Sequence, residues 1–405
     1  RILSKKFKWL GWMGVLSAFL ILGFYCALGG YCLKYVTLNV GNLFHAGFGT
    51  GTLDGAGVFD ALMANQGECV IYGLIFVAIT MVIVMGGVGG GIEKVCSVGM
   101  PALFVMLVIC IIRSCTLDGA SEGLKYMFVP GWALANGVIK EAPNFFSVVS
   151  TAGGQMFFSL SLGMAAMITY GSYLDKKENL QKNAIIIVVM DTLVALMAGL
   201  CVIPGRFALD PTGTLGGPSL LFVTMQNVFD RMGGAGPVFG ILFYLLVVFA
   251  AVSSSISLLE AVVAHFVDKA RDQGKGDKRK AYSVLAGIAA GILCVVVCLD
   301  SLGNAGISPA DILGMRGTME KLPTWSADWL DFFDCIAEGI LMPLGALLMS
   351  IMYGWEIGPE VVHAEATREG QSFGAYGWFK ICIKYITPLC MLLVLYGQIK
   401  EFFFV

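Results

Sequence analysis

Nine runs of about twenty mainly apolar residues dominate this chain, and each is long enough to cross the hydrocarbon core of a bilayer as a helix. The apolar fraction of 57% and the charged fraction of 13% also lie outside the range of soluble domains. We therefore predict an all-α membrane protein with a single polytopic transmembrane domain over residues 1–405. The predicted spans are 10–37, 69–88, 93–113, 145–173, 183–204, 237–267, 281–300, 329–355 and 377–400.

The basic residues predict which ends of these spans face the cytoplasm. Lys and Arg accumulate in cytoplasmic loops, and here they precede the first span as "KKFK" and recur at Lys94, 175–182 and 268–280. These positions alternate in the way that a single cytoplasmic face requires. We expect the protein in the inner (plasma) membrane, with the amino-terminal end of this chain inside the cell and the carboxyl-terminal end outside.

Several classes of function lack their sequence signatures. No G-x-x-x-x-G-K-[ST] loop is present to bind ATP, and no nucleophile is paired with a base at suitable spans. A channel would more naturally give rings of repeated motifs. The net charge of −2 gives no indication of a nucleic-acid partner. We therefore predict that the protein is not an enzyme and that it contacts the lipid bilayer but no nucleic acid.

The fourth span contains an interruption that a simple membrane helix would not need. Gly153 and Gly154 are expected to weaken the helix from one side and Gly163 from the other, so that backbone groups become free near the midplane. Freed carbonyls are hard oxygen ligands for a small cation, and such broken helices line the central sites of transporters. The alternative is that these small residues only allow two helices to pack closely.

Polar residues in the fifth and sixth spans point to an ion. An ionised Asp191 inside a span costs at least ~2.5–3.5 kcal/mol, so a bound cation or proton is expected there; a neutral structural acid is the alternative. Ser253, Ser254, Ser255 and Ser257 supply hydroxyl oxygens to more than one face of the sixth span, and hydroxyl oxygens suit a hard ion such as sodium.

Two further features lie on the predicted outer side. The segment 206–236 is too long for a simple turn and contains an amphipathic, helix-like middle, which predicts either a lid or a helix on the membrane surface. The eighth span begins with Asp331, Asp334 and Glu338, which helical periodicity places on one inward face. Glu338 lies the deepest of the three.

Four stretches carry a family resemblance: "GGQMFFSLSLGMAAMITYGSY", "AAVSSSIS", "LGWMGVLSAFLILGFYCA" and "KYITP". They resemble the neurotransmitter:sodium symporter family, which implies a LeuT-type inverted-repeat helical bundle. In this register the first span corresponds to the family's third helix. The resemblance therefore implies that the family's first two helices are missing from the sequence, for which an incomplete or trimmed sequence is the expected explanation; a genuine nine-span protein is the alternative.

The resemblance also implies roles for individual residues. Sodium site one would include Ser159 and Asp191, and an anion fixed at Asp191 would make chloride unnecessary. Sodium site two would use the Ala250 carbonyl with the Ser253 and Ser254 hydroxyls. The substrate would meet Tyr25, Phe158, Ser161, Met164, Ser254 and Leu258. The outer gate would include Asp334, and the inner gate Asp268 braced by Tyr173.

These implications predict sodium-coupled symport of a neutral amino acid by alternating access. Met164 stands where some family members have phenylalanine, and its adaptable thioether suits a sizeable apolar or aromatic side chain. Two alternatives remain at this stage. The chain is an incomplete, transport-inactive fragment of such a transporter, or it couples amino-acid transport to protons.

Overall fold

A computed structural model describes residues 7, 9–210, 217–276, 278–319 and 321–404, and these residues form helices and loops without a β-strand. The long elements are α1 (Leu10–Leu43), α3 (Gln66–Met85), α4 (Glu93–Cys115), α9 (Leu180–Leu209), α12 (Gly236–Asp272) and α13 (Arg279–Asp300). Two further long stretches are segmented: α16 (Trp329–Asp334), η4 (Cys335–Leu341) and α17 (Met342–Ile351), then α19 (Tyr376–Ile381), η7 (Cys382–Ile386) and α20 (Thr387–Phe403). Shorter helices include α2 (Gly55–Ala64), α5 (Ala120–Phe128), α6 (Trp132–Ala135) and α18 (Pro359–Ala366).

Eight helices in the described part of the chain are long and apolar enough to cross a membrane, and they coincide with eight of the nine predicted spans. The remaining span, 145–173, is divided into α7 (Phe145–Ser159) and α8 (Ala166–Gly171), neither of which crosses a bilayer alone. The all-α membrane fold with a broken fourth span is therefore confirmed.

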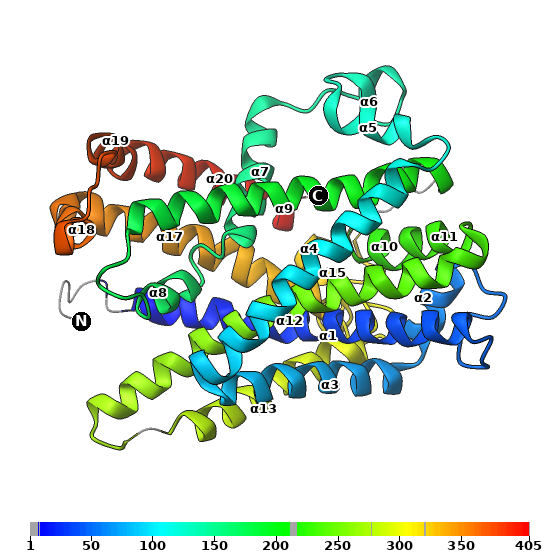
Figure 1. Ribbon diagram of the computed structural model, residues 1–405, viewed down its shortest axis with the longest axis horizontal. Coiled ribbons are helices and arrows are strands. Elements are labelled where there is room, and N and C mark those ends of the chain that lie inside the picture. The colour runs from blue at the N-terminus through cyan, green and yellow to red at the C-terminus, as the bar shows by residue number, and fades with distance from the viewer. Residues whose placement is uncertain (1–6, 8, 211–216, 277, 320, 405) are drawn as a thin grey trace.

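Helix α1 runs through the middle of the bundle, in contact with α12 on one side and with α3 and α13 on another (Figure 1). Its glycines permit this close packing. A Cβ atom at Gly30 would lie 2.5 Å from the backbone nitrogen of Gly73 in α3, and one at Gly23 would lie 2.6 Å from the Leu293 side chain in α13. Helices in lipid associate through such small-residue contacts, because lipid provides no hydrophobic drive between them.

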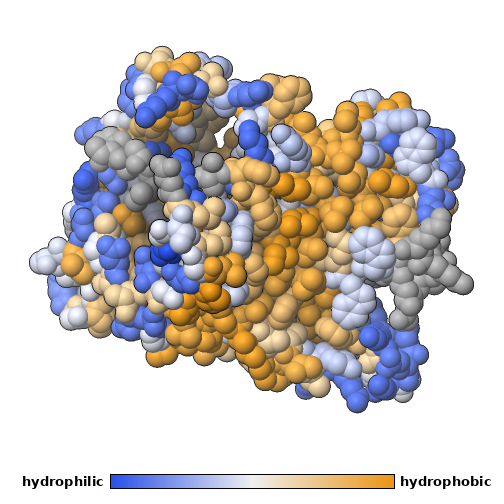
Figure 2. Space-filling model, turned by 180° about the vertical axis from the view of Figure 1, so that it is seen from behind, coloured by the Kyte–Doolittle hydropathy of each residue, from blue (hydrophilic) through white to orange (hydrophobic). Residues whose placement is uncertain are grey.

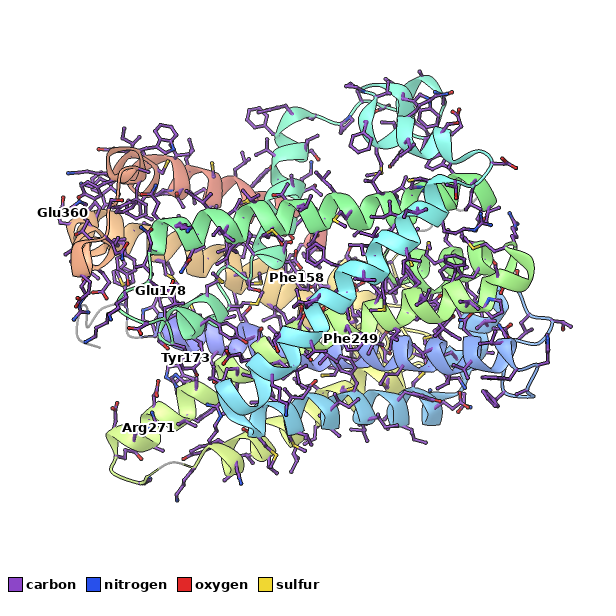
Figure 3. The ribbon with its side chains drawn as sticks, viewed as in Figure 1. Phe158, Tyr173, Glu178, Phe249, Arg271 and Glu360 are labelled. Atoms are coloured by element: carbon purple, nitrogen blue, oxygen red, sulfur yellow. The ribbon has the colours of Figure 1, made fainter. Side chains whose placement is uncertain are left out.

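The charged loops are segregated to the ends of the bundle. Figure 3 shows Tyr173, Glu178, Arg271 and Glu360 at the same end of the long axis. The opposite view has a broad hydrophobic band across the middle, with hydrophilic residues toward both ends (Figure 2). The two basic segments 175–182 and 268–280 thus share one side, as the alternation of basic residues predicts.

The other end of the bundle carries the predicted lid. Residues 211–216 of that segment lie outside the described part, and its first residues belong to the end of α9. The remainder forms α10 (Gly217–Ser219), η2 (Leu220–Thr224), α11 (Met225–Asp230) and η3 (Gly233–Ala235). The Phe222 ring lies 5.0 Å from the Tyr35 ring of α1 and 5.7 Å from the Phe59 ring of α2. The segment is therefore packed on the bundle, which supports the lid over a helix lying on the membrane surface.

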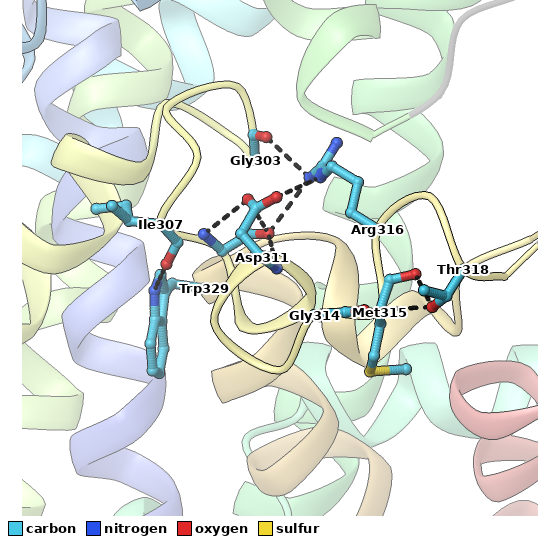
Figure 4. A network of polar contacts seen from close by, with 9 residues as sticks. Gly303, Ile307, Asp311, Gly314, Met315, Arg316, Thr318 and Trp329 are labelled. Carbon is cyan, nitrogen blue, oxygen red and sulfur yellow. Dashed lines mark hydrogen bonds and ion pairs between the residues drawn. The ribbon is translucent and has the colours of Figure 1, made fainter.

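A second loop at this end, between α13 and α16, is held by polar contacts (Figure 4). The Arg316 guanidinium pairs with Asp311 at 2.7 Å and donates to the Gly303 carbonyl. The Ser308 hydroxyl, together with Arg316, holds the pKa of Asp311 below its usual value. Trp329 donates its indole N–H to the Ile307 carbonyl, so the loop is fastened to the start of α16.

Candidate functional site

The interruption of the fourth span lies at residues 160–165, between α7 and α8. Ser161, Gly163 and Ala165 have φ values of 53°, 79° and 61°, and this left-handed conformation ends an α-helix. Gly163 is required here because a Cβ atom would lie 2.5 Å from the Met342 carbonyl oxygen. The broken backbone is thereby pressed against α17.

The prediction that Gly153 and Gly154 contribute to the break is wrong. Both residues lie inside α7, and both allow α20 to approach. A Cβ atom at Gly153 would lie 2.5 Å from Val394, and one at Gly154 would lie 2.1 Å from the Gln398 side-chain nitrogen. The physical reason is that lipid offers no water to a loosened helix, so paired glycines serve close packing unless a neighbouring cavity accepts the free backbone.

The break ends next to the intramembrane acid. The Ser159 hydroxyl, on the last residue of α7, donates a 2.7 Å hydrogen bond to Asp191 Oδ1 in α9. The two residues assigned to sodium site one are therefore neighbours across a gap of 32 residues in sequence. A hydroxyl, a carboxylate and the carbonyls of a broken helix are all oxygen donors, the donor type that a hard cation prefers.

An aromatic pair lies on the other side of the break. The ring of Tyr25 in α1 is 6.4 Å from the ring of Phe158, which lies near the middle of the bundle in Figure 3. The Tyr25 hydroxyl is within hydrogen-bonding reach of Ser254 in α12. Met164 and Leu258 are buried, with 2% and 5% of their surface exposed. The structure thus brings residues of α1, α7 and α12 together around the break.

The serine cluster of α12 is divided among several neighbours. The Ser253 hydroxyl donates to the Ala250 carbonyl at 2.8 Å, so two groups assigned to sodium site two are adjacent. Ser255 is buried and forms a 2.8 Å hydrogen bond with Thr80 of α3. Ser257 forms a 3.0 Å hydrogen bond with Tyr170 of α8. Only Ser253 and Ser254 remain for an ion near the break, while Ser255 and Ser257 connect helices.

The residues assigned to the gates lie toward opposite ends. Asp334 contacts Glu338 one turn further along, and its Oδ1 atom is buried without a hydrogen-bond partner among the described residues. At the other end, Asp268 is exposed. The Tyr173 hydroxyl donates to Glu260, a residue that the sequence did not single out.

Glu260 is the centre of a buried polar group at this end. Its side chain is fully buried in α12 and forms an ion pair with Arg279 of α13. Arg279 also donates to the Val84 carbonyl of α3. The sequence signal was present as a single acid inside the apolar stretch "SLLEAVV", a position where an acid needs a partner.

Comparison with known proteins identifies the family that this arrangement belongs to. The profile described as "Sodium:neurotransmitter symporter family" matches residues 61–403, which include the broken helix, Asp191 and the serine cluster. The chain belongs to this family. Its members are sodium-dependent transporters rather than enzymes, so this symporter is a multi-pass membrane protein that takes sodium and a small solute.

Several relatives agree with this assignment. An uncharacterised sodium-dependent transporter of Bacillus subtilis is 32% identical over 95% of the symporter and 78% of the relative. An uncharacterised sodium-dependent transporter of Haemophilus influenzae is 31% identical over 97% of the symporter and 79% of the relative. A sodium-dependent nutrient amino acid transporter of Drosophila erecta is 27% identical over 41% of the symporter and 26% of the relative.

Proposed function

We propose that this symporter couples sodium entry to the uptake of a neutral amino acid with a sizeable apolar or aromatic side chain, across the cytoplasmic membrane. The single observation that carries the proposal is the hydrogen bond from Ser159 to Asp191 at the end of the broken helix. It brings an intramembrane carboxylate, which needs a cation, to a backbone that offers carbonyl oxygens.

The coupling follows from shared occupancy of this region. Sodium bound between Ser159 and Asp191 neutralises the carboxylate and orders the backbone of residues 160–165. A second sodium ion is held by the Ala250 carbonyl with the Ser253 and Ser254 hydroxyls. A ligand shifts a conformational equilibrium only by its differential affinity for the two states. The ions and the amino acid therefore act together to favour the state in which the site is closed to both sides of the membrane.

The amino acid is held between α1, α7 and α12. The Tyr25 hydroxyl donates a hydrogen bond to the substrate carboxylate, and Phe158 covers the site. Met164 and Leu258 contact the side chain of the substrate. Ser161 and Ser254 line the same side-chain pocket. A relative named as a nutrient amino acid transporter supports this substrate class.

The two ends of the bundle supply the gates. Asp334 closes the outer end, and Asp268 with Tyr173 closes the inner end. Tyr173 also donates a hydrogen bond to Glu260, which is paired with Arg279, so this ion pair is part of the inner gate. The amino-terminal end of the chain faces the cytoplasm, as the basic segments predict. The carboxylate of Asp191 makes chloride unnecessary.

The test is uptake of radiolabelled amino acids into proteoliposomes, with sodium or potassium outside. We expect uptake of apolar or aromatic amino acids with sodium only, unchanged when gluconate replaces chloride. In the Asp191→Asn variant we expect most of this uptake to be lost, unless chloride is present to replace the missing carboxylate. The matched control is Asp175→Asn, which removes an acid from the loop after α8. Equal uptake in potassium would contradict the proposal and favour proton coupling.

The same assay tests whether two further helices precede α1. We compare the 405-residue chain with a version extended by its upstream coding sequence. Transport by the extended version alone would support the register in which α1 is the family's third helix. Transport by both would support the nine-span alternative.

A further inference from the structure

A groove on the flank of the bundle lies away from the substrate site. It has a volume of about 410 Å³ and lies between α1, α12 and α13. Every residue that lines it is apolar or aromatic, including Trp12, Phe266, Tyr282 and Leu285. Nothing in the transport mechanism uses this groove.

The groove has the dimensions of a lipid chain. On α13 it follows the stripe from Tyr282 to Ala289, and seven residues of helix extend about 10 Å. One leaflet of the hydrocarbon core is about 15 Å deep, half of the full thickness. The groove thus covers about two thirds of one leaflet, starting at the end of the bundle that carries the basic loop.

The rim of the groove at that end is aromatic. The ring of Trp12 is 46% exposed and lies 6.0 Å from the ring of Phe266. Phe266 in turn stacks on Tyr282, with 6.0 Å between ring centroids. Trp and Tyr are enriched at the level of the lipid headgroups. The aromatic rim therefore lies where the hydrocarbon of the groove meets the polar interface.

Beyond this rim, one lysine on α12 and one at the start of α13 lie in line with the residues that line the groove. Lys269 follows Phe266 by three residues on α12, and its Nζ atom lies 5.3 Å from the centroid of the Trp12 ring. Lys278 precedes Tyr282 by four residues and occupies the N-cap position of α13. Residues three or four apart share one face of a helix. Both lysines are exposed, and each follows the groove-lining face of its helix toward the basic loop.

The charge of the surrounding loop has the same sign. Residues 268–280 contain six Lys and Arg residues against three Asp residues. Basic clusters next to a transmembrane helix attract anionic lipid headgroups. From the apolar groove, its aromatic rim and the two lysines above it, we propose that this site binds a phospholipid with an anionic headgroup, the acyl chain in the groove and the phosphate between Lys269 and Lys278.

Trp12 allows this proposal to be measured without transport. We reconstitute the purified chain in phosphatidylcholine vesicles containing a minor fraction of brominated phosphatidylglycerol or of brominated phosphatidylcholine. The bromine atoms quench nearby tryptophan, and the Trp12 signal is the difference between the chain and its Trp12→Phe variant. We expect stronger quenching by the brominated phosphatidylglycerol at equal fractions.

Charge variants test whether the two lysines cause the preference for an anionic headgroup. Lys269→Gln with Lys278→Gln should lower the preference for phosphatidylglycerol by about fivefold per lysine, which corresponds to ~1 kcal/mol for each basic residue at the surface. Lys176→Gln with Lys177→Gln removes the same charge from another loop at this end and should leave the preference unchanged. Equal losses in both variants would overturn the proposal in favour of general surface charge.

Two other outcomes would also overturn it. Equal quenching by the two brominated lipids would mean that the groove takes an acyl chain without reading its headgroup. Absence of Trp12 quenching by either lipid would mean that the groove is covered by protein, and cross-linked dimers would then identify a second copy. Because none of these readings depends on uptake, failure of this proposal is distinct from failure of the transport proposal.

Discussion

Helices α1 and α9 have similar apolar compositions but opposite surroundings. In the most apolar stretch of α1, 67% of the residues are buried within the bundle, whereas the corresponding share in α9 is 6%. Helix α1 approaches its neighbours through Gly14, Gly23, Gly29 and Gly30, and α9 exposes a row of large aliphatic side chains instead. The difference teaches that hydropathy identifies a span, while small residues identify the helix at the centre.

The largest expected effect is at the buried ion pair between α12 and α13, the two helices that pack against the central helix α1. Glu260 of the central region receives a hydrogen bond from Tyr173, at the end of the broken helix. Glu260→Gln should lower the free energy of unfolding by about 3 kcal/mol, because Arg279 then loses its buried partner. Thermal unfolding in detergent measures the loss.

The double variant Glu260→Gln/Arg279→Gln is the control for this prediction. It should recover much of the stability, since no charge is left unpaired. A single variant as stable as the wild type would show that this ion pair does not limit the stability of the central helices.

Truncation of one isoleucine in each helix sharpens the comparison. Ile21 in α1 is 1% exposed, and Ile185 in α9 is 55% exposed. We expect Ile21→Ala to cost about 2–4 kcal/mol, because it leaves a cavity. Ile185→Ala should change stability by less than about 0.5 kcal/mol. Equal losses in the same unfolding assay would mean that α9 is covered in the folded protein.

Adding a methyl group tests whether glycine determines the central position. Gly30→Ala should cost about 1–3 kcal/mol, because the new Cβ would meet the backbone of Gly73. Gly11→Ala, in the same helix with nothing within 4 Å, should be neutral or stabilising by up to about 1 kcal/mol. If both variants unfold at the same temperature, the close approach of α1 and α3 does not limit stability.

The smallest expected effect concerns the predicted lid, which packs on α1 at the end opposite the basic loops. Burial raises the pKa of Asp230 in α11, although Gln226 donates a hydrogen bond to its carboxylate and opposes the shift; Asp54 contributes to the rise. Because the folded pKa lies above the ordinary value, the contribution of Asp230 to stability is largest at low pH. It is lost as pH rises through the raised pKa.

Asp230→Asn tests this contribution. The variant should show a smaller decline in unfolding temperature than the wild type as pH rises above the ordinary aspartate pKa of 3.8. Arg231 adjoins Asp230 and contacts the Leu209 carbonyl, so it stays in place in both proteins. Identical pH profiles would assign the lid's stability to its aromatic contacts alone.

The sequence predicted much of the site, but unevenly. Asp191 was recognisable because an acid inside a span needs a partner, and the structure supplies Ser159. Gly163 was recognised correctly as part of the break, whereas Gly153 and Gly154 were not part of it. These glycines have the same local sequence signal. They differ in the helix that packs against them, which is α17 for Gly163 and α20 for Gly153 and Gly154. The local sequence does not indicate which helix will pack there.

The sequence by itself determined the membrane class, the spans, the common side of the basic loops and the presence of an intramembrane acid. These follow from the length of apolar runs and the cost of charge in lipid, which are local properties. The tertiary structure alone decided that α1 is central, that Glu260 joins Tyr173 to Arg279, and that an apolar groove forms between α1, α12 and α13. Each depends on which helices become neighbours, because packing and pairing between distant segments are properties of the assembled bundle.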